Sequence, residues 1–375
     1  MSSIELDYAA LTLDSNVFIG NGLNLERGIL KQLEQFASSP VQLILSEVVY
    51  REIRKHMLER VGESRAKLTS VLKAVKAAFF IADEVADNAA QQLLGKLTND
   101  EVVDQRLQMF LNRTGAKIIS AAGADVQELV DLYFEIDPPF EQSRDKKAEF
   151  PDAIALLSLV SWARQRDVQI LAVSEDKGWT TFAERSDRID SMQDLAKALA
   201  HFQPHNAAKE IVESLKLLIG TSGKHEIFDF VSETVAETIN EAEVDVEYSS
   251  AVHANLDVVE VNYRKHKYVR DDRGLPIVDL VRVEESWLVL RLRLLITYDV
   301  AASFNMSVWD SIEKEYLRIG SSRFTREGSI ETDILVSLTA DFSHGLEHVK
   351  VGELSLDLQL PVVEIGDVEP NMHDE

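Results

Sequence analysis

The first two hundred residues alternate short, mainly apolar runs with longer segments of helical spacing. The runs Leu11–Leu13, Val41–Ser46 and Val168–Ser174 have the length and composition of buried strands. Between them, apolar residues recur every three or four positions. This spacing predicts helices at 24–37, 47 to about 80, 82–97, 99–113 and 125–134, and another from Pro151. Strands that alternate with helices predict an α/β fold, with a parallel sheet flanked by helices.

The pattern changes after His201. Two more helices are predicted at 206–219 and 224–243, and from Val244 onward polar and apolar residues alternate. The even-numbered residues from Leu288 to Ile296 are all apolar, whereas Arg291 and Arg293 fall on the opposite side, where we expect solvent. Such alternation predicts a separate β-rich (α+β) domain built on an antiparallel sheet. The expected organisation is an α/β domain at 8–203, a helical linker at 204–243, an antiparallel β-rich domain at 244–363 and a disordered tail at 364–375.

Composition excludes several classes of protein. The chain of 375 residues has no cysteine, which rules out disulfides and thiolate metal sites. It also lacks an apolar run long enough to span a membrane and a recognisable signal peptide, so we expect a cytoplasmic protein with no membrane partner. The net charge is −25, of which residues 201–375 contribute −17. Overall acidity argues against a non-specific nucleic-acid surface across the whole molecule.

One segment of the N-terminal half is basic. Residues 51–76 carry eight Lys and Arg against three Glu, a balance of +5, within a predicted helix. The segment can guide a nucleic-acid backbone, or it can be an ordinary charged helix face, and the sequence does not separate these readings.

Four acids occupy positions where an α/β sheet gathers its ligands. Asp14 and Asp176 follow predicted strands, while Glu52 and Asp152 lie near the starts of predicted helices. Strand ends and helix starts converge on one crevice of an open parallel sheet. Clustered carboxylates repel one another, so the arrangement predicts a divalent cation among them. The alternative for any single acid is a helix cap. Glu47 is interpreted as a capping acid in the first turn of the helix. It lies five residues before Glu52, so the two side chains cannot point the same way from the helix.

The acids and their neighbours resemble the PIN-domain nuclease family. The matching stretches are Leu13-Asp14-Ser15-Asn16-Val17-Phe18, the segment Ser46–Glu52, Phe150-Pro151-Asp152-Ala153 and Val173-Ser174-Glu175-Asp176-Lys177, within residues 8–203. The segments around Pro138-Pro139-Phe140 and before Asp152 are similar to a bacterial PIN-like branch of mostly unassigned function.

The resemblance implies a set of roles. Asp14, Asp152 and Asp176 would bind Mg²⁺ or Mn²⁺, Glu52 would complete the catalytic pocket, and Asn16 and Ser174 would be supporting polar residues. Gly178-Trp179 stands where many relatives carry a further acid, which puts a second metal in doubt. Trp179 itself is interpreted as core or crevice wall.

The chemistry agrees with the resemblance. Phosphodiester hydrolysis needs an activated water and a stabilised leaving oxygen, and a hard cation held by carboxylates supplies both. Lys147, together with Lys146, precedes Asp152 and can contact phosphate or remain a solvated loop lysine. We therefore predict a metal-dependent (endo)ribonuclease, a hydrolase that acts on single-stranded RNA in preference to DNA.

Two other functions remain open. One is a catalytically silent PIN-like scaffold that binds a protein partner through its β-rich domain. The other is a regulated defence or toxin-type protein, in which the acidic C-terminal domain restrains the active site.

Overall fold

The computed structural model describes residues 8–140, 149–202, 206–221, 224–284, 286–339 and 349–370. It divides into two compact units, Met1–Phe202 and Gln203–Glu375, each described by itself below.

A five-stranded parallel sheet forms the centre of the first unit. Its strand order is β3-β2-β1-β4-β5, so the chain fills one side of β1 and then returns to fill the other. The carboxyl ends of β1 and β4 therefore flank the point where strand order reverses, which is where open α/β sheets bind ligands. The strands are β1 (Ala10–Leu13), β2 (Gln42–Ser46), β3 (Lys117–Ile119), β4 (Ile170–Val173) and β5 (Ile189–Met192).

Helices flank this sheet, as predicted. Helices α3 and α7 pack against β2 and β3, while α9 packs against β4 and β5 and α8 against β5. The predicted helix at 24–37 is instead a short α-helix followed by a 3₁₀ helix. None of the helices within the described ranges is long and apolar enough to cross a membrane. The helices are α1 (Ser15–Gly20), α2 (Gly28–Lys31), η1 (Gln32–Ser38), α3 (Glu47–Phe79), α4 (Asp83–Leu94), α5 (Asn99–Thr114), η2 (Ala121–Gly123), α6 (Val126–Glu135), α7 (Phe150–Arg166), α8 (Lys177–Ala183) and α9 (Leu195–His201).

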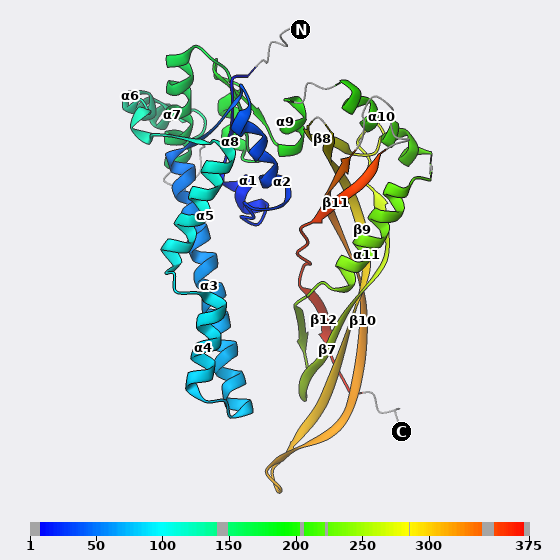
Figure 1. Ribbon diagram of the computed structural model, residues 1–375. Helices are drawn as coiled ribbons and strands as arrows, with labels where there is room; N and C mark the ends of the chain where they lie inside the picture. Colours follow the sequence, from blue (N-terminus) through cyan, green and yellow to red (C-terminus); the bar gives the residue numbers. More distant parts are fainter. Residues whose placement is uncertain are drawn as a thin grey trace. The chain divides into compact units, whose positions relative to one another are not determined.

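Helix α3 runs far past the sheet, with α4 and α5 alongside it (Figure 1). Only its first turns are buried, through Val49, Ile53 and Met57.

Most of the basic residues of 51–76 are paired with neighbouring groups of the first unit. Arg54 bonds Asp100 and Asp104 at 2.8 and 2.6 Å. Arg51 pairs with Glu47, Arg60 with the carbonyl of Gly22, Arg65 with that of Leu97 and Lys76 with Asp83. Much of the basic segment is thus an internally paired helix face.

The second unit is built on an antiparallel sheet, so the predicted fold class is confirmed for both halves of the chain. Strand order is β11-β10-β9-β7, and β8 also pairs with β9. Even-numbered residues of β9 from Leu288 to Val300 are buried in its main core. The strands are β6 (Val246–Ser249), β7 (His253–Tyr268), β8 (Val278–Val283), β9 (Trp287–Asp310), β10 (Glu315–Thr339), β11 (Lys350–Leu356) and β12 (Val363–Asp367).

The predicted helical linker at 204–243 is wrong. Helices α10 (Asn206–Gly220) and α11 (Glu226–Asn240) pack on the antiparallel sheet, against β8 and against β7 and β11 (Figure 1). Their apolar stripes, including Leu215 and Val235, join the same core as Leu290 and Ile334. A sheet with one apolar face needs a cover, and these helices supply it.

The predicted disordered tail at 364–375 is also wrong for its first part. Residues Val363–Asp367 form β12, which pairs in parallel with β6. Ile365 and Val368 are buried against Phe304 in a small second core, and this burial offsets the entropy of ordering the segment. Residues 371–375 lie outside the described part of the chain.

Arg291 does not face solvent as expected. Its side chain is 3% exposed and bonds Asp279 and Asp333 on the two neighbouring strands. Arg293 is half-buried and bonds Asp333 at 2.7 Å. Paired charges across strands therefore cover this side of the sheet.

Candidate active site

Asp14 lies at the carboxyl end of the central strand. Its backbone N–H donates to the carbonyl of Val173 at 2.9 Å, which ties the ends of β1 and β4 together. Its side chain is 4% exposed and caps α1 by accepting the backbone N–H of Ser15. The other carboxylate oxygen, Oδ2, accepts the hydroxyl of Ser174 at 2.7 Å. Asp14 is therefore a buried carboxylate with a fixed orientation.

Ser174 connects Asp14 to Asp176. Ser174 is fully buried, and its Oγ accepts the backbone N–H of Asp176 at 2.9 Å. Asp176 in turn caps α8, where its Oδ1 accepts the N–H groups of Gly178 and Trp179. No hydrogen bond to Oδ2 of Asp176 is found among the described residues, so that oxygen remains available to a ligand. Capping and ligand binding are thus compatible roles for this acid.

Asp152 joins the same network through Trp179. It lies in the first turn of α7, behind Pro151. The indole Nε1–H of the buried Trp179 donates to Asp152 Oδ1 at 2.9 Å. Three acids from three separate helix starts are therefore linked by a continuous set of hydrogen bonds through Ser174 and Trp179.

Glu52 acts on the cluster through its charge, whereas Glu47 is bonded elsewhere. The negative charge of Glu52 contributes to raising the pKa of both Asp14 and Asp152. Glu47 instead accepts the backbone N–H of Ala121 at 3.0 Å and pairs with Arg51, away from these acids. The charge of Glu52 is therefore felt by two of the other three acids, Asp14 and Asp152.

The electrostatics of the cluster are unfavourable to ionised acids. Burial raises the pKa of Asp152 to about 7, and the charges of Asp14, Asp176 and Glu52 add to the rise. Burial likewise raises the pKa of Asp14, opposed by its hydrogen bonds from Ser174 and Ser15. A perturbed pKa at a ligand-binding edge is typical of a functional site.

The side chains of the cluster are of the type that binds a hard divalent cation. Its oxygens are carboxylates, the preferred ligands of Mg²⁺. Asn16 donates weakly to Ser174 Oγ, at 3.4 Å, while its own Oδ1 is buried with no hydrogen-bond partner among the described residues. A buried acceptor without a donor is costly, and a cation or its bound water would satisfy it. Within the described ranges, however, no three His, Asp or Glu side chains converge closely enough to enclose an ion. The acids adjoin one another without forming a closed set of ligands.

Sequence reasoning missed the role of Trp179 and the reason for Gly178. Trp179 is buried, which agrees with its prediction as core or crevice wall, but it also donates a hydrogen bond to Asp152. A Cβ on Gly178 would lie 2.8 Å from Asp176 Oδ1 and 3.2 Å from Pro139 Cβ, so glycine allows this close approach. The sequence signal was the Gly-Trp pair directly after Asp176-Lys177. Lys147, predicted to contact phosphate, lies outside the described residues.

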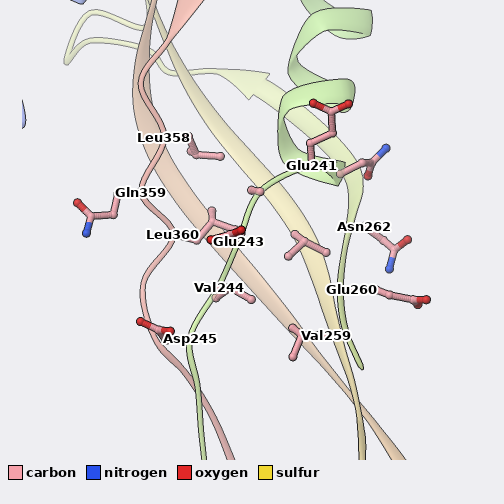
Figure 2. Close-up of a pocket in the computed structure, with 13 residues that line it drawn as sticks. Glu241, Glu243, Val244, Asp245, Val259, Glu260, Asn262, Leu358, Gln359 and Leu360 are labelled. Carbon is pink, nitrogen blue, oxygen red and sulfur yellow. The ribbon is translucent and has the colours of Figure 1, made fainter. Parts of the chain in front are cut away.

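A hollow of about 1180 Å³ lies elsewhere, in the second unit. It is bordered by the end of α11, the 241–245 segment, β7 and residues 358–360 (Figure 2). Leu358 and Leu360 point toward the 241–245 segment and Gln359 points away from it. Glu241, Glu243 and Asp245 are exposed and alternate with half-buried apolar residues. These acids form a solvated face, and the hollow has none of the linked carboxylates found at β1 and β4.

Comparison with known proteins agrees with the geometry. A family model for the PIN domain matches residues 11–179, which includes all four acids and Trp179. No curated protein and no solved structure matches the chain significantly.

Proposed function

We propose that this protein is a metal-dependent nuclease that hydrolyses phosphodiester bonds, in RNA in preference to DNA. The match of residues 11–179 to the PIN-domain family model, which describes a nuclease-type fold, supports this proposal. One observation carries the proposal. Asp14, Asp152 and Asp176 are linked by hydrogen bonds through Ser174 and Trp179, at the point of the sheet where strand order reverses.

In this proposal Asp14, Asp152 and Asp176 hold Mg²⁺ or Mn²⁺, and Glu52 completes the ring of negative charge. The bound ion would supply Lewis-acid activation of water and neutralisation of charge on the phosphate. Ser174 fixes the direction of Asp14, and Trp179 fixes that of Asp152. Without a cation, a proton on Asp152 relieves the repulsion near neutral pH, as its pKa of about 7 indicates. Cation binding must then displace that proton, so affinity should increase with pH.

The silent scaffold is the second candidate. The absence of a closed set of ligands among the described residues favours it. Cation affinity separates the two functions, because a nuclease of this type must bind the ion in order to act and a scaffold has no such need.

The test is cleavage of single-stranded RNA by purified protein with Mn²⁺, compared with EDTA and with a DNA of matched sequence. Asp14→Asn and Asp176→Asn should reduce cleavage to background while the protein stays folded, because an amide oxygen can still cap a helix. Asp125→Asn is the matched control. Asp125 caps α6 through Gln127 and Glu128 just as Asp176 caps α8, and it lies outside the carboxylate network. Equal cleavage by the parent protein and by Asp14→Asn,Asp176→Asn would refute the proposal.

A further inference from the structure

We infer that Phe134 is a stacking platform that receives a base of a single-stranded nucleic acid whose backbone reaches the carboxylate network. This inference rests on the proposed function and adds to it how the substrate is held. Phe134 lies in the last turn of α6, and 75% of its side chain is exposed. Exposing a large aromatic ring to water is unfavourable, so such a ring can bind a ligand with a flat apolar face.

Phe134 is the outermost member of a connected group of rings. Its centroid is 5.2 Å from that of Tyr133, with the planes at 77°. Tyr133 contacts Phe140 and Phe150 at 5.5 and 5.1 Å, and these two rings contact each other at 5.1 Å. Phe140 is buried, which anchors the group. Phe134 is therefore supported from one side by packed aromatic rings, one of which is buried.

The same ring group borders the carboxylate network at two places. Phe150 begins α7, two residues before Asp152. On the other side, Pro139 precedes Phe140 and lies so close to Gly178 that a Cβ there would be 3.2 Å from Pro139 Cβ. Gly178 donates its backbone N–H to Asp176. The ring group that carries Phe134 thus reaches Phe150, two residues before Asp152 in the chain, and Phe140, whose neighbour Pro139 lies close to Gly178.

The charges around Phe134 favour a base over a phosphate. Asp131 and Glu135 on α6 are exposed and would repel a phosphate at this position. Stacking needs no positive charge, since every base has a π-face, and single-stranded segments present unstacked bases. A paired duplex conceals those faces, so the geometry favours single strands.

An apolar protein partner is the competing occupant. Val126 and Val130 share a face with Phe134 at spacings of four residues, and both are exposed. A partner docked on that stripe would need all three side chains. A stacked base needs only the ring of Phe134, and this difference makes Val126, 71% exposed on the same helix, a suitable control.

The experiment measures binding in EDTA, where metal-dependent cleavage cannot occur. A fluorescent oligouridylate is titrated with the full-length parent, Phe134→Ala, Phe134→Trp and Val126→Ala, and so is a matched oligomer of abasic sugars. We expect Phe134→Ala to weaken binding of the oligouridylate roughly 5- to 150-fold, the equivalent of about 1–3 kcal/mol per stacked base. The abasic oligomer should bind the parent and Phe134→Ala equally, and Val126→Ala should behave as the parent.

Two further readouts distinguish stacking from a structural effect. In Phe134→Trp, affinity should be retained and the added indole fluorescence should fall on binding of the oligouridylate. The loss caused by Phe134→Ala should have the same size at 50 and 200 mM salt, because stacking releases no counterions.

Three results would overturn the inference. They are unchanged binding by Phe134→Ala, an equal loss with the abasic oligomer, and an equal loss in Val126→Ala. Each of these can occur while the parent still cleaves RNA with Mn²⁺. Conversely, base-dependent binding without any cleavage would support the stacking role and refute the nuclease.

Discussion

The indole of Trp179 donates its N–H to Asp152 across 2.9 Å, from the first turns of α8 to the first turn of α7. This bond links the starts of two helices. It also favours the ionised form of Asp152 in a site where burial and three neighbouring acids oppose ionisation.

Trp179→Phe should therefore impair the site without unfolding the domain. The ring volume is largely kept, but Asp152 loses a donor, so its pKa should rise further above 7. A hydrogen bond to a charged group contributes about 1.5–3 kcal/mol, which corresponds to roughly 10- to 100-fold in Mn²⁺-dependent cleavage at pH 7. The pH–activity profile should also move to higher pH. Trp162→Phe, on the same helix as Asp152 but near its other end, is the control. An identical profile for Trp179→Phe and the parent would contradict this role.

Stability without metal should fall as pH rises through the range set by Asp152. Its native pKa is about 7 and its ordinary value is 3.8, so the native state binds the proton more tightly than the unfolded state does. The contribution is fully present below about pH 4, is lost progressively up to about pH 7 and is then constant. At about 1.4 kcal/mol per pKa unit, the upper bound is on the order of 4 kcal/mol.

Urea unfolding in EDTA from pH 4 to 8 measures this effect for the parent and for Asp152→Asn. We expect the parent to lose stability relative to the variant over that range, so that the variant is the more stable protein at pH 8. Mn²⁺ should raise the parent's melting temperature and should affect the variant much less, because a ligand that binds only the native state stabilises it. A variant less stable than the metal-free parent at pH 8 would mean that Asp152 is a structural cap.

Much of this site was readable from sequence because its determinants are local. Asp14 and Asp176 closely follow short apolar strands, and Asp152 follows a proline in the first turn of a helix. Because each acid is next to a strand end or a helix start in the sequence, its position at the edge of the sheet could be predicted. Parallel topology, itself predicted from the alternation of strands and helices, then brought the acids together.

The features that sequence reasoning missed depend on distant partners. Strand β12 pairs with β6, and Ser249 bonds Asp367 across 118 positions, so no local pattern distinguishes this segment from a tail. Arg291 occupies an ordinary polar position of a strand, and its burial depends on Asp279 and Asp333 in neighbouring strands. The apolar stripes of α10 and α11 were visible, but the surface that they cover was not.

Gly178→Ala should damage the site through geometry alone. The added Cβ would lie 2.8 Å from Asp176 Oδ1, so either the cap of α8 or the contact with Pro139 must shift. Overpacking of this kind costs about 1–3 kcal/mol of stability. The rate of cleavage should fall even at temperatures where the variant stays folded, because Asp176 is displaced. Gly20→Ala is the control, since nothing lies within 4 Å of its added Cβ. Thermal melting and cleavage are measured on both variants, and equal behaviour would show that the site tolerates the shift.

The boundary between the two units gives the last prediction. The structure divides at Phe202 and Gln203, and α10 and α11 belong to the core of the second unit. A fragment of residues 203–375 should therefore fold cooperatively. A fragment that starts at 244, where the sequence suggested the β-rich domain begins, should not. Without the two helices, the buried face formed by residues such as Leu290, Leu292 and Ile334 is exposed to water.

Circular dichroism and urea unfolding compare the two fragments directly. Each fully buried aliphatic side chain contributes about 1.5–3 kcal/mol, and α11 alone buries Ile227, Val231, Val235 and Ile239. Four such side chains contribute about 6–12 kcal/mol, which is comparable with the 5–15 kcal/mol by which a typical domain is stable, and the sheet residues left uncovered add to the loss. The shorter fragment should therefore be aggregated or unfolded. If the shorter fragment melts cooperatively at the same temperature as 203–375, α10 and α11 are not needed for the fold and act as a linker.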